Sequence, residues 1–377
     1  MRLERQWLCQ RPGLRPPSRH AHSRRHQRGR PLCLRLAAAG GFGQPPRREL
    51  GAAVTITLTE HPYPLPPAEQ FELIGLWRSE WSRTDYDWLE ALNGDYSETL
   101  ETISVVARID GRPVATATVS FAKHAPETCL IGNVVTLAAF RGHGLARGVT
   151  EAAVELGFRA GCTAAFLGSS QHEGNVYERC GFSRLAGSIM RRPAPGYVET
   201  GAEFETGQPA GIRPAVWGDM PGFVRFLTEP QATVVIDYEH GLIAMAHAEP
   251  LRCVSAFAVL HDDAARRNGA MLVLAAGNRV LGVGTVTPGP KGAGAHRAKI
   301  DFATHENYAP RLDELLARLL ADAASREVSI IETLIAETDR SKLEVLSRAG
   351  FEPIATLPGH LRLRHGYTDV LQLERRL

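Results

Sequence analysis

The sequence lacks several patterns that mark familiar protein classes. No apolar run reaches the roughly 18 residues that a membrane span needs, so we expect the folded part to be soluble, with no membrane partner. The cysteines form no C-x-x-C pair and no other zinc-type spacing, so we expect no metal site. Their sparse use suits the reducing cytoplasm. The six cysteines are at positions 9, 33, 129, 162, 180 and 253.

Acidic residues are nearly missing from the first 50 positions. Residues 1–50 contain twelve Arg, no Lys and two acids, a net charge of +10, whereas 31 basic and 39 acidic residues give the rest of the chain −8. Because this arm is rich in Pro, Arg, His and Gly without periodicity, we expect it to be disordered. It fits a nucleic-acid-binding tail, an organelle transit peptide, or upstream sequence translated from a start codon placed too early. We favour the last, since the recognisable fold begins abruptly at Val54.

The stretch from Val134 to Arg147 joins a β-branched run to a basic, glycine-rich turn and an amphipathic helix. The first N–H groups of a helix lack partners and, with the helix dipole, attract anions. Gly142 and Gly144 let the backbone approach a phosphate with no Cβ in the way. The stretch therefore predicts a diphosphate site. It does not fit the dinucleotide pattern G-x-G-x-x-G, which is followed by an acid about twenty residues later.

Two landmarks in order resemble the GNAT superfamily of N-acyltransferases. The spacing Arg141-x-x-Gly144-x-Ala146 is similar to its acyl-CoA signature. Tyr177 stands four residues before Gly181 and Phe182, as in the superfamily's second landmark, and a predicted helix and strand separate the two. The resemblance implies acetyl-CoA as the co-substrate.

The pair Gly181-Phe182 recurs as Gly350-Phe351, with an apolar strand upstream of each, so the chain resembles a tandem repeat. With 377 residues and 44% hydrophobic content, it can form two cores without disulfides. We expect an α/β (α+β) protein with two tandem GNAT folds, each a mixed, mostly antiparallel central sheet flanked by helices. The expected parts are a disordered Arg-rich arm (1–50), a catalytic GNAT domain (54–192), a linker (193–209) and a degenerate GNAT-like domain (210–377).

Hydrophobic periodicity and turn residues place the elements of each copy. In the first copy, strands are expected near 54–58, 102–109, 113–121, 128–137 and 163–168, and helices near 69–81, 85–93 and 144–160. In the second copy, strands are expected near 252–259, 270–276, 279–287, 297–304 and 328–336 with two closing strands, and helices near 216–227, 310–323 and 339–348.

The second copy lacks both landmarks. It has no glycine where the first copy has its glycine-rich turn. Glu306 would bring a negative charge close to a diphosphate there, and Leu346 replaces the tyrosine. We therefore expect one active site, in the first copy.

The resemblance implies roles for the residues of the first copy. Backbone groups of residues 134–136 would pair with the pantetheine arm and donate to the thioester carbonyl. Tyr177 would be the catalytic general acid for the CoA thiolate, since a phenol has a pKa of about 10. Asn175 would hold pantetheine or cap a helix. The expected cofactor-binding residues are Val134, Val135, Thr136, Arg141, Gly142, His143, Gly144, Leu145, Ala146, Arg147 and Asn175.

The general base is not identified by the sequence, because the strand from Thr128 to Val135 contains no acid. Glu127, His124 and a water chain are the alternatives. This family places its acceptor lid between its first two helices, where tryptophans and acids suit a cationic amine. The same tryptophans could instead build the core. The candidate acceptor residues are Trp81, Asp85, Trp88 and Asn133.

Together these features predict an acetyl-CoA-dependent N-acetyltransferase that acts on a primary amine of a small molecule, by direct attack in a ternary complex. The alternative is an acyl-CoA-sensing or regulatory protein without turnover. An amino sugar, amino acid, antibiotic, polyamine, protein lysine or protein N-terminus all fit as acceptor. We expect no nucleic acid partner, and a homodimer is compatible with the sequence.

Overall fold

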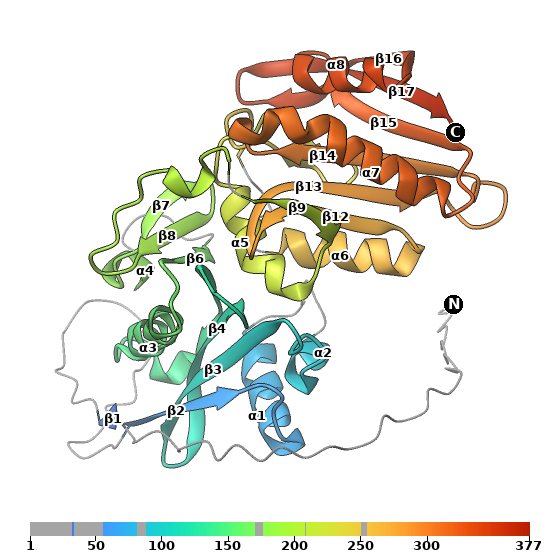
Figure 1. Ribbon diagram of the computed structural model, residues 1–377. Helices are drawn as coiled ribbons and strands as arrows, with labels where there is room; N and C mark the ends of the chain where they lie inside the picture. Colours follow the sequence, from blue (N-terminus) through green and yellow to red (C-terminus); the bar gives the residue numbers. More distant parts are fainter. Residues whose placement is uncertain (1–31, 34–55, 81–87, 170–175, 208, 250–254) are drawn as a thin grey trace. The chain divides into compact units, whose positions relative to one another are not determined.

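The computed structural model describes residues 32–33, 56–80, 88–169, 176–207, 209–249 and 255–377. Most strands belong to two large sheets (Figure 1). One has eight strands in the order β1-β2-β3-β4-β5-β6-β8-β7, and the other has seven in the order β16-β17-β15-β14-β13-β12-β9. Of the arm expected to be disordered (1–50), the structure describes only Leu32–Cys33, which pair with Thr57 and Leu58 as a short strand; the rest of the arm and Val54 lie outside the described residues.

The first sheet and its helices come from the first half of the chain. Its strands are β1 (Leu32–Cys33), β2 (Ile56–Pro62), β3 (Leu100–Ile109), β4 (Arg112–Ala122), β5 (Thr128–Thr136), β6 (Ala164–Gly168), β7 (Ser183–Ala186) and β8 (Ile189–Pro193). Its helices are α1 (Pro67–Arg78), α2 (Trp88–Asn93), η1 (Ala138–Phe140), α3 (Leu145–Arg159) and α4 (Val176–Arg179).

The second half follows the 3-10 helix η2 (Ala202–Phe204). Its strands are β9 (Gly211–Pro214), β10 (Val235–Asp237), β11 (Leu242–Ile243), β12 (Ala270–Ala276), β13 (Arg279–Pro288), β14 (Arg297–Thr304), β15 (Ile330–Ala336), β16 (Glu352–Leu363) and β17 (Gly366–Arg376). Its helices are η3 (Trp217–Asp219), α5 (Met220–Phe226), α6 (Ala256–Arg267), η4 (Glu306–Arg311), α7 (Leu312–Ala324) and α8 (Arg340–Arg348).

The two sheets repeat one topology, which confirms the predicted fold class of two tandem α/β folds. In the order β2 to β8-β7 and the order β9 to β17-β16, neighbouring strands are antiparallel except for one parallel pair in each sheet. The parallel pairs are β5 with β6 and β14 with β15. The second half differs by a short inserted pair, β10 with β11, between α5 and α6.

Helices cover both faces of the first sheet. Both faces need cover because successive side chains of a strand point to opposite sides of the sheet. The apolar stripe of α3, including Val149 and Ala153, packs on one face with Val105 and Ile131. On the other face, Trp77 of α1 packs in a separate cluster with residues of β3 and β5. The β3–β4 hairpin turns at Asp110 and Gly111, both with positive φ (50° and 78°), as a tight hairpin turn favours.

Helices α5 and α6 join the two halves through a shared core. Phe223 and Phe257 are fully buried, and their ring centroids lie 5.7 Å apart. The same cluster contains Leu130 and Phe166 of the first sheet and Val273 of the second. Burying a side chain of this size contributes about 1.5–3 kcal/mol. The apolar side chains of this cluster therefore couple the stability of the two halves.

Polar contacts join the halves near the start of β5. Arg279 donates to both carboxylate oxygens of Glu127, at 2.9 and 2.8 Å. The side-chain amide of Asn278 donates to the carbonyl of His124. Nearby, the Trp217 ring stacks on Tyr96 with 3.6 Å between centroids. The second half therefore contacts both the β4–β5 loop and the segment after α2.

The strand predicted near 252–259 is wrong in its described part, because Ala256–Arg267 form helix α6; residues 252–254 lie outside the described residues. Phe257 and Leu260 are buried at helical spacing, and Asn268 ends the helix with φ of 58°. A short apolar run does not by itself separate a strand from a helix.

The sequence interpretation also missed several short elements. It predicted neither the β7–β8 pair nor the β10–β11 pair, and η2 lies inside the expected linker. Among the described residues, no helix is both long and apolar enough to cross a membrane. Cys129, Cys162 and Cys180 are buried and free of disulfides.

We predict that Phe223→Ala lowers the free energy of unfolding by about 3–5 kcal/mol, since it leaves a cavity in the shared core. Urea denaturation measures the loss. Val198→Ala, at a side chain that is 76% exposed, is the control and should change it by less than about 0.5 kcal/mol. Hydrogen exchange should show α3 and α7 losing protection together. Loss of protection in α7 alone would contradict a shared core.

Candidate functional site

The first sheet opens where its two parallel strands diverge. Strands β5 and β6 are paired through three residue pairs, the last being Leu130 with Phe166. Strand β5 continues to Thr136, whereas β6 ends at Gly168. Within the described residues, β5 from Ile131 to Thr136 has no strand partner on the β6 side. Its backbone N–H and C=O groups on that side can therefore pair with an extended ligand.

A β-bulge changes the direction of the β5 backbone at this opening. The pairing with β4 shifts between Thr116 and Thr118, which oppose Val135 and Gly132, so β5 carries one extra residue. Asn133 in the bulge has a φ of 48°, a conformation that asparagine adopts more readily than most residues. The predicted acceptor residue Asn133 thus lies in the bulge, beside the predicted cofactor residues 134–136.

Buried hydrogen bonds hold the bulge in place. The indole N–H of Trp77 donates to the Thr116 hydroxyl at 3.0 Å, and that hydroxyl donates to the Asn133 carbonyl at 2.8 Å. Trp77 is 1% exposed and Thr116 fully buried. Helix α1 therefore fixes the backbone at the opening, so Trp77 is a core residue with a positioning role.

The start of α3 lies just after the end of β5. Gly142 and Gly144 have φ of 81° and 76°, a left-handed conformation that glycine adopts without strain. Gly144 is the N-cap, and the first turn of α3 holds no acidic residue. The first N–H groups of the helix, from Leu145 on, lack intrahelical partners. This turn has the form that binds phosphate groups.

The two arginines of the turn are already paired with acids. Arg141 donates to the Thr136 carbonyl at 3.1 Å and forms an ion pair with Glu80. Arg147 pairs with Glu151 at 2.8 Å, one helical turn later. Both arginine side chains are more than half exposed. The backbone N–H groups are therefore the main anion donors here, and the arginines add a screened positive charge.

Tyr177 lies on α4, in the core that supports α3. It packs edge-on against Phe182, with 6.4 Å between ring centroids. Burial raises the pKa of Tyr177 to about 12, and the nearby Cys180 thiol adds to the rise. The phenol therefore keeps its proton throughout the physiological pH range. It can donate a hydrogen bond or a proton, but it cannot act as a base near neutral pH.

Several predicted site residues cannot be placed. Asn175, Trp81 and Asp85 lie outside the described residues. Trp88 is the first residue of α2, but its side chain is not described. His143 lies in the turn before α3, with its ring nitrogen Nδ1 at 3.2 Å from the Phe140 carbonyl. The binding and catalytic roles of the predicted site residues therefore stay predictions.

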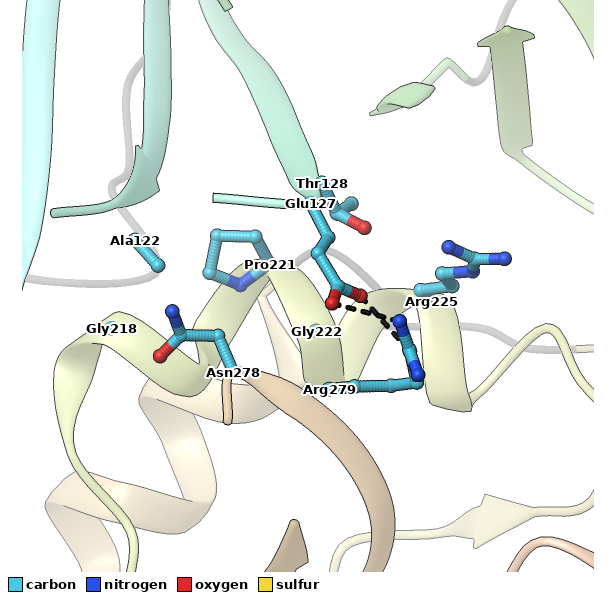
Figure 2. Close-up of a pocket in the computed structure, with 9 residues that line it drawn as sticks. All are labelled: Ala122, Glu127, Thr128, Gly218, Pro221, Gly222, Arg225, Asn278 and Arg279. Carbon is cyan, nitrogen blue, oxygen red and sulfur yellow. Dashed lines mark hydrogen bonds and ion pairs between the residues drawn. The ribbon is translucent and has the colours of Figure 1, made fainter. Parts of the chain in front are cut away.

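The two candidates for a general base lie at the joint between the halves. Figure 2 shows the Glu127 carboxylate turned toward Arg279, with which it forms two hydrogen bonds, beside a small cavity of about 10 Å³. That volume holds about one water molecule. The His124 backbone is bound by Asn278. Glu127 therefore joins the two halves and is not poised as a base.

The second half has the same divergence, but its own chain fills it. Strands β14 and β15 pair through three residue pairs, as β5 and β6 do. The N–H of Ala232 donates to the Thr304 carbonyl at 2.9 Å. The N–H of Val234 donates to the carboxylate of Asp339, the N-cap of α8, at 2.7 Å. The segment before β10 thus bridges β14 and α8.

A buried ion pair between Lys342 and Asp301 fills the same gap, where β14 diverges from β15. Lys342 of α8 is fully buried, and its ammonium donates to Asp301 at 2.8 Å and to the Val235 carbonyl at 3.0 Å. Burial raises the pKa of Asp301 to about 6, although Lys342 opposes the rise. Strand β14 also has no shift in its pairing with β13. The second half therefore lacks both the bulge and the open edge.

Sequence reasoning missed three positioning residues. Thr116 and Trp77 hold the bulge, and Glu80 pairs with Arg141. The sequence did hold a signal for Thr116. Together with Thr118 and Ser120 it stands at every second position of β4, which places three hydroxyl groups on one buried face. Within the described ranges, no group of three or more His, Cys, Asp or Glu could hold a metal ion.

Comparison with protein families supports the resemblance for the first half. Residues 67–182 match the model of the Acetyltransferase (GNAT) family. The matched range contains β5, the turn before α3 and Tyr177. A search of curated protein sequences finds no significant match.

Solved structures of acetyltransferases are similar to less than half of the chain. A ribosomal-protein-alanine N-acetyltransferase from Brucella melitensis is 18% identical with a TM-score of 0.36, over 44% of this chain and 99% of that one. A GCN5-related N-acetyltransferase from Kribbella flavida is 22% identical (TM-score 0.36; 45% and 98%). A putative acetyltransferase from Salmonella typhimurium, solved with its cofactor acetyl-CoA, is 16% identical (TM-score 0.37; 45% and 94%).

We predict that Gly144→Glu abolishes acetyl-CoA binding, because it places a carboxylate where the helix N–H groups would receive the diphosphate. The matched control is Gly111→Glu, at a hairpin turn with a similar φ (78°) and no heavy atom of the described residues near an added Cβ. Thermal-shift titration with acetyl-CoA compares the two. Equal loss of binding in both variants would show that backbone strain, and not the cradle, is responsible.

Proposed function

We propose that the first half transfers an acetyl group from acetyl-CoA to a primary amine of a small molecule, by direct attack in a ternary complex. One observation carries this proposal: the open edge of β5 leads to the glycine turn at the start of α3. An extended ligand with a diphosphate at one end needs both features in this order. The acetyltransferase family match over residues 67–182 supports the same reaction.

Different residues of the first half would bind different parts of acetyl-CoA. The backbone of residues 134–136 would pair with the pantetheine arm, and the N–H groups from Gly142 to Arg147 would hold the diphosphate. A backbone N–H of residues 134–136, next to the bulge at Asn133, would donate to the thioester carbonyl, where negative charge develops as the amine attacks. Acetyl-CoA supplies the activated acyl group.

Tyr177 is the proposed proton donor to the departing thiolate. A phenol whose pKa is raised to about 12 stays protonated near neutral pH and is therefore available to donate its proton.

The second half is proposed to bind no acetyl-CoA. Its divergence is bridged by the segment before β10 and by Lys342. Its role is to support the first half through α5, α6 and Arg279.

An acyl-CoA sensor without turnover is the second candidate. The ion pair between Glu127 and Arg279 favours it, because it engages the carboxylate that stands nearest the start of β5. A panel of amines assayed for CoA release separates the two functions. Release that depends on one class of amine supports the transferase, whereas acetyl-CoA binding without release supports the sensor.

We predict that Tyr177→Phe lowers kcat by about tenfold to a thousandfold and leaves the affinity for acetyl-CoA largely unchanged. Because the pKa of Tyr177 is raised to about 12, its ionisation should cause no loss of wild-type kcat between pH 7 and 10. Steady-state kinetics and a binding titration measure the two quantities. Equal losses in kcat and in affinity would refute the acid role.

A further inference from the structure

Three hydroxyl groups form a chain that runs from Tyr63, directly after β2, across β3 to β4. The Tyr63 hydroxyl lies 2.9 Å from the Ser104 hydroxyl, which lies 3.1 Å from that of Thr118. Ser104 is fully buried and Thr118 is 4% exposed, whereas Tyr63 is partly exposed. In both hydrogen bonds either oxygen can be the donor. The chain can therefore be polarised in either direction, which a proton relay requires.

The inner end of this chain, Thr118, is paired with the residue of β5 that precedes the bulge. Thr118 is paired with Gly132, so the two residues share a face of the sheet. A Cβ placed on Gly132 would have no heavy atom of the described residues within 4 Å. Gly132 directly precedes the bulge at Asn133. Thr118 is thus the residue of β4 that is paired with β5 directly before the bulge, where the thioester would approach.

The second half supplies an internal comparison. Gly132 of β5 and Asp301 of β14 are equivalent, because each stands two residues after the last pair that its strand forms with the parallel neighbour. Thr118 opposes Gly132, and Thr285 opposes Asp301. In the second half this place is filled, because Asp301 binds Lys342 and Thr285 donates to Asp237 at 2.7 Å. The space beside Thr118 is therefore a feature of the copy that keeps the open edge.

We propose that Thr118 is a catalytic residue that takes the proton of the attacking amine, and that Ser104 and Tyr63 pass it to water. This inference rests on the proposed function. It supplies the proton acceptor that Glu127, held by Arg279, does not provide.

The step balances in atoms and charge. The amine nitrogen forms a bond to the thioester carbon, and the carbon–sulfur bond breaks. As the nitrogen loses its proton to Thr118, the Thr118 proton moves to Ser104, that of Ser104 to Tyr63, and that of Tyr63 to water. The thiolate takes a proton from Tyr177, which recovers one from water. The net products are the amide and CoA.

A second hydroxyl pair provides a matched control. Thr102 and Ser120 lie on the same two strands and the same face, with their oxygens 3.2 Å apart. Ser120 opposes Leu130, which is buried in the shared core, and not Gly132. Removing a hydroxyl from this pair disturbs the same sheet without reaching the open space.

The experiment compares Thr118→Val with Thr102→Val in the full chain, with acetyl-CoA and the best amine of the panel. We expect T118V to lower kcat by about tenfold to a hundredfold, with the KM for acetyl-CoA and the melting temperature changed no more than in T102V. Thr118→Ser, which keeps the hydroxyl, should recover most of the loss. In mixtures of H2O and D2O, wild-type kcat should fall along a curve, since several protons move, and T118V should lose that curvature.

The outcomes separate the two proposals. If T118V turns over as fast as T102V, or keeps the curvature, the relay is overturned while the transferase stands. If the wild-type protein binds acetyl-CoA but releases no CoA with any amine, the proposed function is overturned and the relay with it.

Discussion

The candidate site depends on one geometric constraint, the divergence of β5 from β6 after the pair Leu130 and Phe166. A parallel pair that ends after three residue pairs leaves a backbone edge whose N–H and C=O groups need partners. The second half has the same divergence, and there its own chain donates to β14 while Lys342 neutralises Asp301. The same fold thus carries an open gap in one copy and a closed gap in the other.

The open gap has structural support from both halves of the chain. On one side, Trp77 and Thr116 hold the bulge through buried hydrogen bonds. On the other side, α5 packs on Leu130, and Arg279 binds Glu127 at the start of β5. The part of β5 that precedes the opening is therefore fixed by packing and ion pairing, which preorganises the backbone beyond it.

The sequence was sufficient to predict the two folds and the glycine turn, because both rest on local patterns. Gly142 and Gly144 form the turn before α3 where the sequence placed it, and the structure adds that both have a positive φ. It was not sufficient for α6, whose apolar run suits a strand as well as a helix. Nor could it show that Glu127 pairs with Arg279, 152 residues away, or that Thr118 meets Ser104 and Tyr63. Such contacts depend on strand register and on the packing of the halves, which no local pattern records.

The central claim is that one copy of the fold binds acetyl-CoA and the other is closed by its own chain. The most direct test is the stoichiometry of acetyl-CoA binding to the full chain, measured by isothermal titration calorimetry. The account predicts one acetyl-CoA per chain. Two molecules per chain would contradict the closure of the second copy, and no binding would contradict the site itself.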